Sequence, residues 1–200
     1  MTDPSSLAPA AFLITNQVAD FDTWKATFDS AEQLRAANGY LGHHINRAED
    51  DPNSVTVFFA VADADKAKAF VTSDEVKAIM AKPGVISAPE YTWVTPVREN
   101  IVWDRQLPAF VATHHVADFD AWLAGYDAAE EVRTSRGIIG QAVNQSIEDP
   151  SLAVVYHQAE SFDTLRSFLE SEDLKEAMHK AGVISEPQAT FYTGGWGKQY

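Results

Sequence analysis

A gapless internal repeat constrains this 200-residue chain more than any other feature. Residues 11–97 return as residues 109–195 at a constant offset, and roughly 33 of the 87 paired positions are identical. A copy of this length lies near the lower size limit for an independent core, so the two copies are expected to pack on each other. The sequence therefore predicts a first domain over residues 1–97, a connector over 98–108 and a second domain over 109–200.

Each copy is predicted to run strand, helix, strand, strand, helix, strand. Asp20 and Asp118 stand where a helix N-cap is expected, and Asp-Pro turns precede the third strand of each copy. Ser73 and Ser171 are expected to interrupt the second helical segment. The expected strands are 12–18, 41–46, 55–61 and 90–95, then 110–116, 139–144, 152–158 and 188–193; the expected helical segments begin at residues 21, 64, 119 and 162.

This order is the ferredoxin-like βαββαβ motif, which belongs to the α+β class. Helices cover one face of such a sheet, and the other apolar face needs a partner. The second copy is the obvious partner, and joining the two sheets edge to edge also removes exposed strand edges. We therefore expect two tandem ferredoxin-like domains that form an intramolecular dimeric α/β barrel, a monomeric pseudo-dimer whose outer surfaces leave room for a further homodimer.

Three repeated patterns resemble the dimeric α/β-barrel superfamily, and the nearest likeness is to antibiotic-biosynthesis-monooxygenase-like and stress-responsive barrel proteins. The patterns are the VADFD-x-W entry to the first helix, the Asp-Pro turn, and a Phe-x-x-Ser-Asp/Glu-x-x-Lys-x-x-Met run over residues 70–80 and 168–178. The resemblance covers nearly the whole chain, twice. It implies a small-molecule pocket between the sheet and the helices of each unit, while the fold itself hosts many activities.

Side chains expected to line these pockets follow from strand and helix periodicity. They are predominantly aromatic, and most of them are also what a packed core would contain. Heme-degrading members of the superfamily carry a tryptophan and a histidine where this chain has Phe70 and Met80, so the resemblance does not extend to heme breakdown. The candidate substrate-binding residues are Asn16, Trp24, Phe28 and Phe70 in the first copy and Phe110, Trp122, Phe168 and Met178 in the second.

The histidines differ between the copies, since each pairs with a non-histidine at the equivalent position. The fold therefore does not require them. His114 and His157 lie on strands expected to be neighbours and form the best acid/base pair. Tyr126 and Tyr156 are candidate hydrogen-bond donors to a developing anion. Strand alternation places Tyr156 and His157 on opposite faces, so only one of them can share a pocket with His114. These four residues are the candidate catalytic set. Whether one or both pockets function is open at this point; if the protein has one principal site, we expect it in the second copy, around His114.

Composition limits the kinds of partner and cofactor that the chain is expected to bind. The net charge of −14 comes without a basic patch, so nucleic acid is not expected to bind. The chain has no cysteine, no Gly-rich phosphate loop in a strand–turn–helix context and no histidine pair that could chelate one ion, so no metal and no cofactor are expected. No apolar run reaches the length of a membrane span and no signal peptide is evident, which predicts a cytoplasmic protein without membrane attachment.

Two functions remain open at this point. The leading interpretation is a cofactor-independent enzyme, of the monooxygenase, isomerase or cyclase type, acting on a hydrophobic aromatic or polyketide-like small molecule. The alternative is a non-catalytic barrel that binds a small molecule or serves a stress-related role. An aromatic pocket with added polar residues in the second copy favours the enzyme. The absence of a recognised catalytic set favours the alternative.

Overall fold

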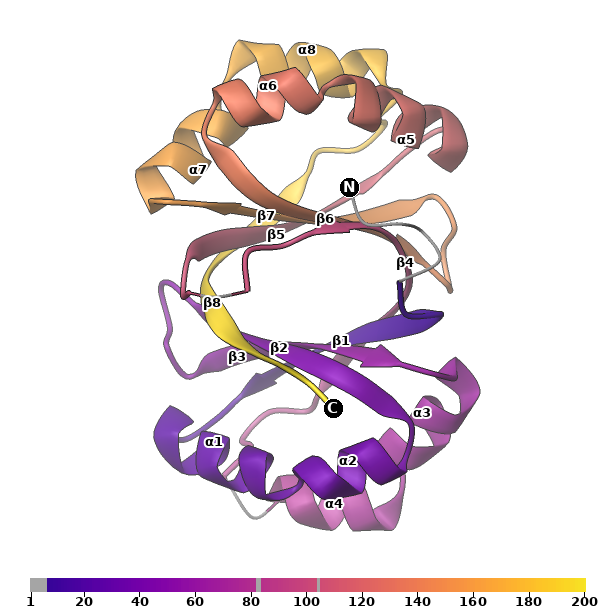
Figure 1. Ribbon diagram of the computed structural model, residues 1–200, viewed down its shortest axis with the longest axis vertical. Helices are drawn as coiled ribbons and strands as arrows, with labels where there is room; N and C mark the ends of the chain where they lie inside the picture. Colours follow the sequence, from indigo (N-terminus) through magenta and orange to yellow (C-terminus); the bar gives the residue numbers. More distant parts are fainter. Residues whose placement is uncertain (1–6, 82–83, 104) are drawn as a thin grey trace. The chain divides into compact units, whose positions relative to one another are not determined.

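A computed structural model describes residues 7–81, 84–103 and 105–200. Its elements follow the predicted order in both copies (Figure 1). The first copy contains β1 (Ala10–Gln17), α1 (Phe21–Ser30), α2 (Glu32–Ala37), β2 (Tyr40–Ala48), β3 (Ser54–Val61), α3 (Ala64–Val71), α4 (Asp74–Ala81) and β4 (Glu90–Asn100). The second contains β5 (Pro108–His115), α5 (Phe119–Ala128), α6 (Glu130–Ser135), β6 (Ile138–Ser146), β7 (Leu152–Ala159), α7 (Phe162–Leu169), α8 (Glu172–Lys180) and β8 (Gln188–Gln199).

The expected helix caps are present. Asp20 and Asp118 have extended backbones, and their side chains accept hydrogen bonds from the backbone N–H groups of Thr23 and Ala121. These bonds satisfy amide groups that have no partner within the helix. Ser171 caps α8 in the same way. The N-cap residues in the sequence therefore predicted correctly where these helices begin.

The first helical segment differs from the prediction, because it is two helices rather than one. Ala31 separates α1 from α2 with φ −91° and ψ 10°, and Ala129 separates α5 from α6 with nearly the same angles. At the end of the first helix of each copy, a buried arginine from the second helix donates to a backbone carbonyl that also accepts from the N–H of Ala31 or Ala129. Arg35 Nη1 donates to the Phe28 carbonyl oxygen at 2.6 Å, and Arg133 Nη1 donates to that of Tyr126.

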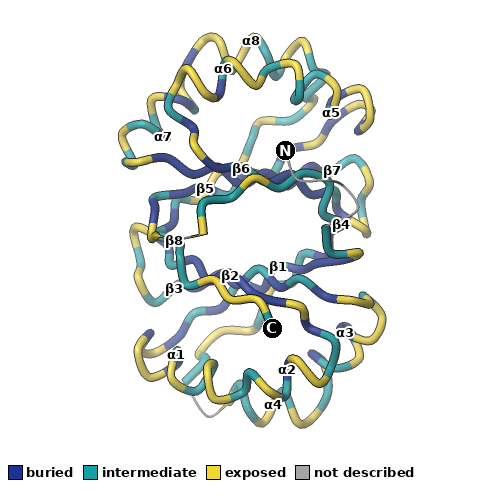
Figure 2. Tube along the Cα trace, viewed as in Figure 1, coloured by how far each residue is buried: buried dark blue, intermediate teal, exposed yellow. Residues whose placement is uncertain are grey.

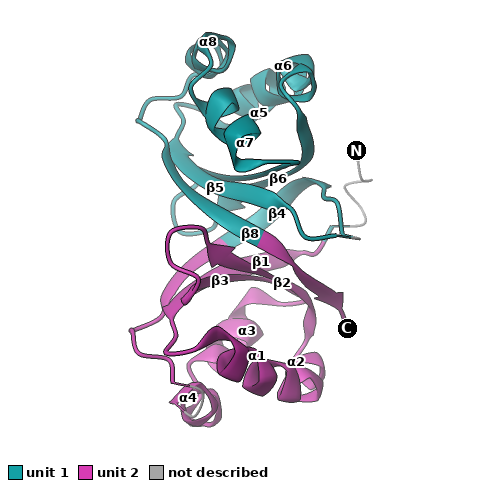
Figure 3. Ribbon diagram, turned by 90° about the vertical axis from the view of Figure 1, so that its left-hand side faces the viewer, with its two compact units in different colours: residues 1–7, 94–193 teal, residues 8–93, 194–200 magenta. Residues whose placement is uncertain are grey.

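Residues gather into two compact units that are not identical to the two copies (Figure 3). Unit 1 holds residues 1–7 and 94–193, and unit 2 holds residues 8–93 and 194–200. The boundaries fall inside β4 and β8, which both run past the predicted ends of their strands. The residues from Val94 to Asn100, which the sequence divided between first domain and connector, pair with β6. Each unit therefore takes the end of the other copy's last strand.

The paired strands within each unit run antiparallel. In unit 2, β3 lies between β1 and β2; in unit 1, β7 lies between β5 and β6, and the first half of β8 pairs with β5. Because β4 and β8 belong to both sheets, the order of hydrogen-bonded neighbours closes on itself as β1-β3-β2-β8-β5-β7-β6-β4. In each unit the helices cover one face of its sheet, and the buried residues concentrate on the strands (Figure 2).

The two equivalent tryptophans on the first helix of each copy occupy the interior between helix and sheet. Trp24 is 5% exposed and Trp122 is 2% exposed. Trp24 packs between Phe21 and Phe28, with ring-centroid distances of 5.8 and 5.0 Å. Large buried aromatic area of this kind dominates the stability of a small core.

We expect Trp24→Ala and Trp122→Ala each to lower the free energy of unfolding by about 3–5 kcal/mol, because each leaves a large cavity. Urea denaturation followed by circular dichroism measures the loss. A loss well below 1 kcal/mol for either variant would contradict this role.

A second prediction concerns Gly140 on β6. A Cβ there would meet the Gln158 amide, with Oε1 at 2.1 Å. That amide is fixed, because it accepts from the Val102 N–H at 2.9 Å and donates to the Val102 carbonyl at 3.2 Å. Gly140→Ala should therefore destabilise unit 1 by about 1–3 kcal/mol. Calorimetry of Gly140→Ala with and without Gln158→Ala tests the cause. The double variant should cost less than the sum of the two single ones, and strict additivity would argue against the clash.

Candidate functional site

Each unit contains a cavity between its sheet and its helices. The cavity of unit 2 has a volume of about 100 Å³, and the cavity of unit 1 has a volume of about 410 Å³. Pockets that hold small molecules usually measure about 300–1,000 Å³. Only the cavity of unit 1 reaches that size, so the two copies differ in the room they offer to a ligand.

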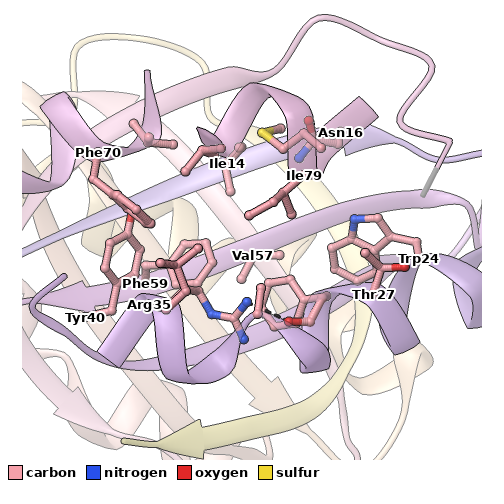
Figure 4. A pocket seen from close by; sticks show the side chains of 16 residues that line it. Ile14, Asn16, Trp24, Thr27, Arg35, Tyr40, Val57, Phe59, Phe70 and Ile79 are labelled. Atoms are coloured by element: carbon pink, nitrogen blue, oxygen red, sulfur yellow. Dashed lines mark hydrogen bonds between the residues drawn. The ribbon is translucent and has the colours of Figure 1, made fainter. Parts of the chain in front are cut away.

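The cavity of unit 2 is narrowed by aromatic rings (Figure 4). Phe28 and Phe59 stack with centroids 5.9 Å apart, and Tyr40 packs edge-on against Phe59 at 5.1 Å. All four first-copy candidates, Asn16, Trp24, Phe28 and Phe70, line this cavity. Asn16 Oδ1 is buried and has no hydrogen-bond partner among the described residues.

Smaller side chains explain the larger volume in unit 1. Ala112 stands where the first copy has Ile14, and His157 stands where it has Phe59. Ala189 replaces Tyr91, whose ring reaches within 6.3 Å of the Phe12 ring centroid in unit 2. Sequence reasoning noted that His157 pairs with a non-histidine in the first copy and did not single out Ala189. Aligning the last strands of the two copies would have found it.

The second-copy candidates come together around this cavity, with one exception. Phe110, Trp122, Phe168 and Met178 line it, as do His114, Tyr126 and His157. Tyr156 does not; it packs with Ala109 and Ala142 on the other face of β7. The alternation of strand side chains is the reason, because consecutive residues point to opposite faces. The structure therefore brings three of the four candidate catalytic residues to one place and leaves Tyr156 out.

A buried polar network lies beside the cavity of unit 1. Tyr126 Oη donates to Gln141 Oε1 at 2.8 Å and contacts His157 Nε2 at 3.1 Å. Arg133 Nε donates to the same Gln141 oxygen at 2.6 Å, and the Arg133 guanidinium lies 3.8 Å from the centroid of the Tyr126 ring. The network connects α5, α6, β6 and β7, so it fixes the Tyr126 hydroxyl and the His157 ring relative to each other.

Two nitrogen atoms of the cavity histidines have no hydrogen-bond partner among the described residues. They are His114 Nε2 and His157 Nδ1. The two side chains are 6% and 4% exposed, so bulk water does not satisfy them freely. An unpaired polar group in a protein interior is costly, and it is often found where a ligand or a reaction uses it.

Burial keeps both imidazoles neutral. Desolvation lowers the pKa of His114 to about 4, and the electrostatic influence of the neighbouring His115 acts in the same direction. Desolvation also lowers the pKa of His157 to about 3, assisted by Arg133 and His114. Burial raises the pKa of the Tyr126 phenol, so it keeps its proton near neutral pH. The site can thus offer neutral imidazole lone pairs and a neutral hydroxyl.

Sequence reasoning did not single out the buried arginines. Arg35 and Arg133 occupy the same position in both copies, and each guanidinium covers the ring at the end of the first helix. In unit 2, Arg35 Nε donates to Tyr200 Oη at 2.6 Å, and that oxygen also contacts His43 Nδ1 at 2.7 Å. The sequence did contain a signal for these arginines, because Arg35 and Arg133 are identical although most of the residues around them differ between the copies.

Other kinds of site find little support in the part of the chain that the structure describes. Those residues contain no group of three or more histidine, aspartate or glutamate side chains placed to share a metal ion. None of the helices in residues 7–81, 84–103 and 105–200 combines the length and the apolar character needed to span a bilayer.

Comparison with known proteins identifies the fold. No family model matches the sequence. No curated protein matches it either. Among solved structures, an anthrone oxidase-like protein has a TM-score of 0.69 and 11% identity, covering 98% of this chain and 95% of its own. A candidate monooxygenase from Lactobacillus acidophilus has a TM-score of 0.65 and 9% identity, with 96% of both chains covered.

A ferredoxin-fold protein from Listeria monocytogenes, related to antibiotic biosynthesis monooxygenases, gives a TM-score of 0.53 at 8% identity and covers 96% of this chain and 98% of its own. At these identities the likeness concerns the fold. Together with the closed strand order and the repeated βαββαβ units, it shows that this chain has the dimeric α/β-barrel fold of the antibiotic-biosynthesis-monooxygenase-like proteins.

Proposed function

We propose that the protein is a cofactor-independent monooxygenase-type enzyme that acts on a hydrophobic aromatic molecule in the cavity of unit 1. One observation carries the proposal: a cavity of about 410 Å³ with aromatic walls contains two buried neutral histidines, each with an unpaired nitrogen. Apolar walls with a few convergent polar groups are the usual composition of a small-molecule site. The fold shared with an anthrone oxidase-like protein makes oxygenation the reaction class to test first.

The chemistry that suits this site begins with proton removal. A substrate methylene flanked by aromatic rings gives its C–H proton to a neutral imidazole of His114 or His157. The resulting carbanion adds to dioxygen, and the peroxide anion takes the proton back. Loss of the second C–H proton breaks the O–O bond and leaves a carbonyl and hydroxide, which becomes water. One oxygen atom of dioxygen enters the product and the other leaves as water.

Aromatic walls contribute by excluding water and holding the substrate plane. Trp122 packs edge-on against His114 with centroids 5.3 Å apart, and Phe168 packs against His157 at 5.6 Å. A dry site strengthens the interaction of a developing anion with the imidazolium that forms when a histidine takes the proton. These contacts would position the reacting carbon beside the two histidines.

The first test uses anthrone as the probe. Binding is measured by fluorescence titration, and turnover is measured as dioxygen consumption and quinone absorbance. The double variant Ala112→Ile with Ala189→Tyr restores first-copy residues that the repeat accommodates in unit 2, so it should fold and should lose at least tenfold in affinity. Ala36→Ile, which enlarges an exposed alanine of α2, is the control and should bind anthrone as the parent does.

The variant His114→Asn introduces the first-copy residue Asn16 and should lower turnover by about 10²–10⁴-fold while the fold persists. Anthrone binding without dioxygen consumption in the parent protein would instead favour the non-catalytic binding protein. An unchanged affinity in the cavity-filled double variant would remove unit 1 as the site.

The proposal also predicts how stability depends on pH. Histidines in the unfolded chain titrate near pH 6.5, whereas the pKa of His43, His114 and His157 is lowered to about 3, 4 and 3. Between these values the unfolded chain binds more protons than the folded one. Stability is therefore complete above about pH 6.5 and is lost as the pH falls toward about 3–4. The free energy of unfolding should be lower at pH 5 than at pH 7.5.

The matched variant His157→Phe carries the first-copy residue Phe59 at this position. It removes one titrating group, so its stability should change less between pH 7.5 and pH 5 than that of the parent. Urea denaturation at the two pH values measures both slopes. An equal slope in parent and variant would show that His157 titrates normally in the folded protein.

A further inference from the structure

Gln141 is the starting point, because its orientation is fixed by chemistry. Arg133 can donate hydrogen bonds but cannot accept them. The Gln141 amide atom that lies 2.6 Å from Arg133 Nε must therefore be the oxygen. The flipped amide would place its NH2 group, a donor, against the Arg133 N–H, which is also a donor, so that orientation is excluded.

The proton of the Tyr126 hydroxyl follows from the same atom. Tyr126 Oη lies 2.8 Å from Gln141 Oε1. Two oxygen atoms at this distance need a hydrogen between them, and the amide oxygen has none. The Tyr126 hydroxyl therefore donates its single hydrogen bond to Gln141, and its oxygen can only accept a hydrogen bond from any other partner.

That other partner is His157. Its Nε2 lies 3.1 Å from Tyr126 Oη, so Nε2 must carry a proton. The imidazole is neutral because it is buried, and a neutral ring has only one N–H. His157 Nδ1 is therefore a bare lone pair, and it is the atom that has no hydrogen-bond partner among the described residues. The His157 side chain lines the cavity of unit 1, and Nδ1 itself is covered by neighbouring atoms, so a ligand hydroxyl reaches it when those atoms move aside.

We infer that Arg133, Gln141 and Tyr126 lock His157 as the Nε2–H tautomer, so that Nδ1 accepts a hydrogen bond from a hydroxyl group of the ligand. This inference rests on the proposed function and narrows its substrate class to aromatic molecules with a hydroxyl donor, such as phenols and naphthols. Arg133, Gln141 and Tyr126 are positioning residues in this arrangement, since they act through His157.

The first copy shows that the arrangement is specific to unit 1. Phe28 and Phe59 stand at the positions of Tyr126 and His157, so a hydroxyl and an imidazole are both missing there. The arginine is retained, but its Nε donates to Tyr200 instead. Both units thus link the guanidinium to an imidazole, through Tyr200 to His43 in unit 2 and through Gln141 and Tyr126 to His157 in unit 1. Of these two imidazoles, His157 is the one that lines its unit's cavity.

Nuclear magnetic resonance of the ¹⁵N-histidine-labelled full chain tests the tautomer without requiring activity. The Nε2–H tautomer of His157 should dominate from pH 6 to pH 8, with Nδ1 at the shift of an unprotonated nitrogen. In Tyr126→Phe, which restores the first-copy residue, the lock is gone and the His157 nitrogen shifts should move toward an average of both tautomers. A dominant Nδ1–H form in the parent protein would overturn the inference.

A matched probe pair tests the ligand class. 1-Naphthol and 1-methoxynaphthalene differ in one hydroxyl donor, and the parent protein should bind 1-naphthol at least tenfold more tightly. In His157→Phe this preference should fall to about twofold or less, because both probes then meet the same apolar ring. Equal affinities of the parent for both probes would overturn the assignment of an acceptor.

The two proposals fail in different ways. If neither probe binds but the tautomer is locked, the proposed function is wrong and the network stands. If 1-naphthol binds without preference and the tautomer is mixed, the cavity binds aromatic molecules and the inference about His157 is wrong.

Discussion

A buried arginine that lies over an aromatic ring supports the rest of each unit. Arg35 and Arg133 are 7% and 4% exposed, which would be unfavourable for an unpaired charge. Each guanidinium faces the ring of residue 28 or 126 and donates to the backbone carbonyl of that same residue. It thereby adds a second hydrogen bond to a carbonyl at a helix end that also accepts from the N–H of Ala31 or Ala129, and it packs against the ring that lines the cavity. The guanidinium is the part of the site that the fold itself requires.

Duplication allowed the two cavities to diverge around this common support. Unit 2 fills the space with Ile14, Phe59 and Tyr91, and this dense packing stabilises the core. Unit 1 has smaller side chains at these three positions, so its interior is less densely packed and its cavity is larger. Unpaired histidine nitrogens add to the cost. A chain with one densely packed unit can tolerate a more open second unit, because the packed interior supplies part of the stability that the open one lacks.

Much of the fold was predictable because it depends on local chemistry. Asp20 and Asp118 predict where two helices begin. The alternation of side chains along β7 correctly predicts that Tyr156 and His157 lie on opposite faces of the strand. The break at Ala31 was not predictable in this way, since alanine favours a continuous helix and no side chain caps α2 there. The extension of β4 to Asn100 was missed because its partner strand, β6, lies far along the chain. For the site, the sequence predicted which side chains face the cavity. It could not predict the hydrogen-bond network through Gln141, because that network depends on how closely α5, α6, β6 and β7 approach one another.

The division of β4 and β8 between units has a consequence for biosynthesis. Unit 2 contains residues 194–200, and among them Tyr200 is the hydrogen-bond partner of Arg35. Residues 8–93 leave the ribosome first, yet their sheet and their buried arginine are completed only after the whole second copy has been made. Contacts between residues so far apart in sequence form slowly, because a long loop must close first. The first half of the chain is thus exposed to aggregation or to chaperones during synthesis, although it is the half with the more densely packed interior.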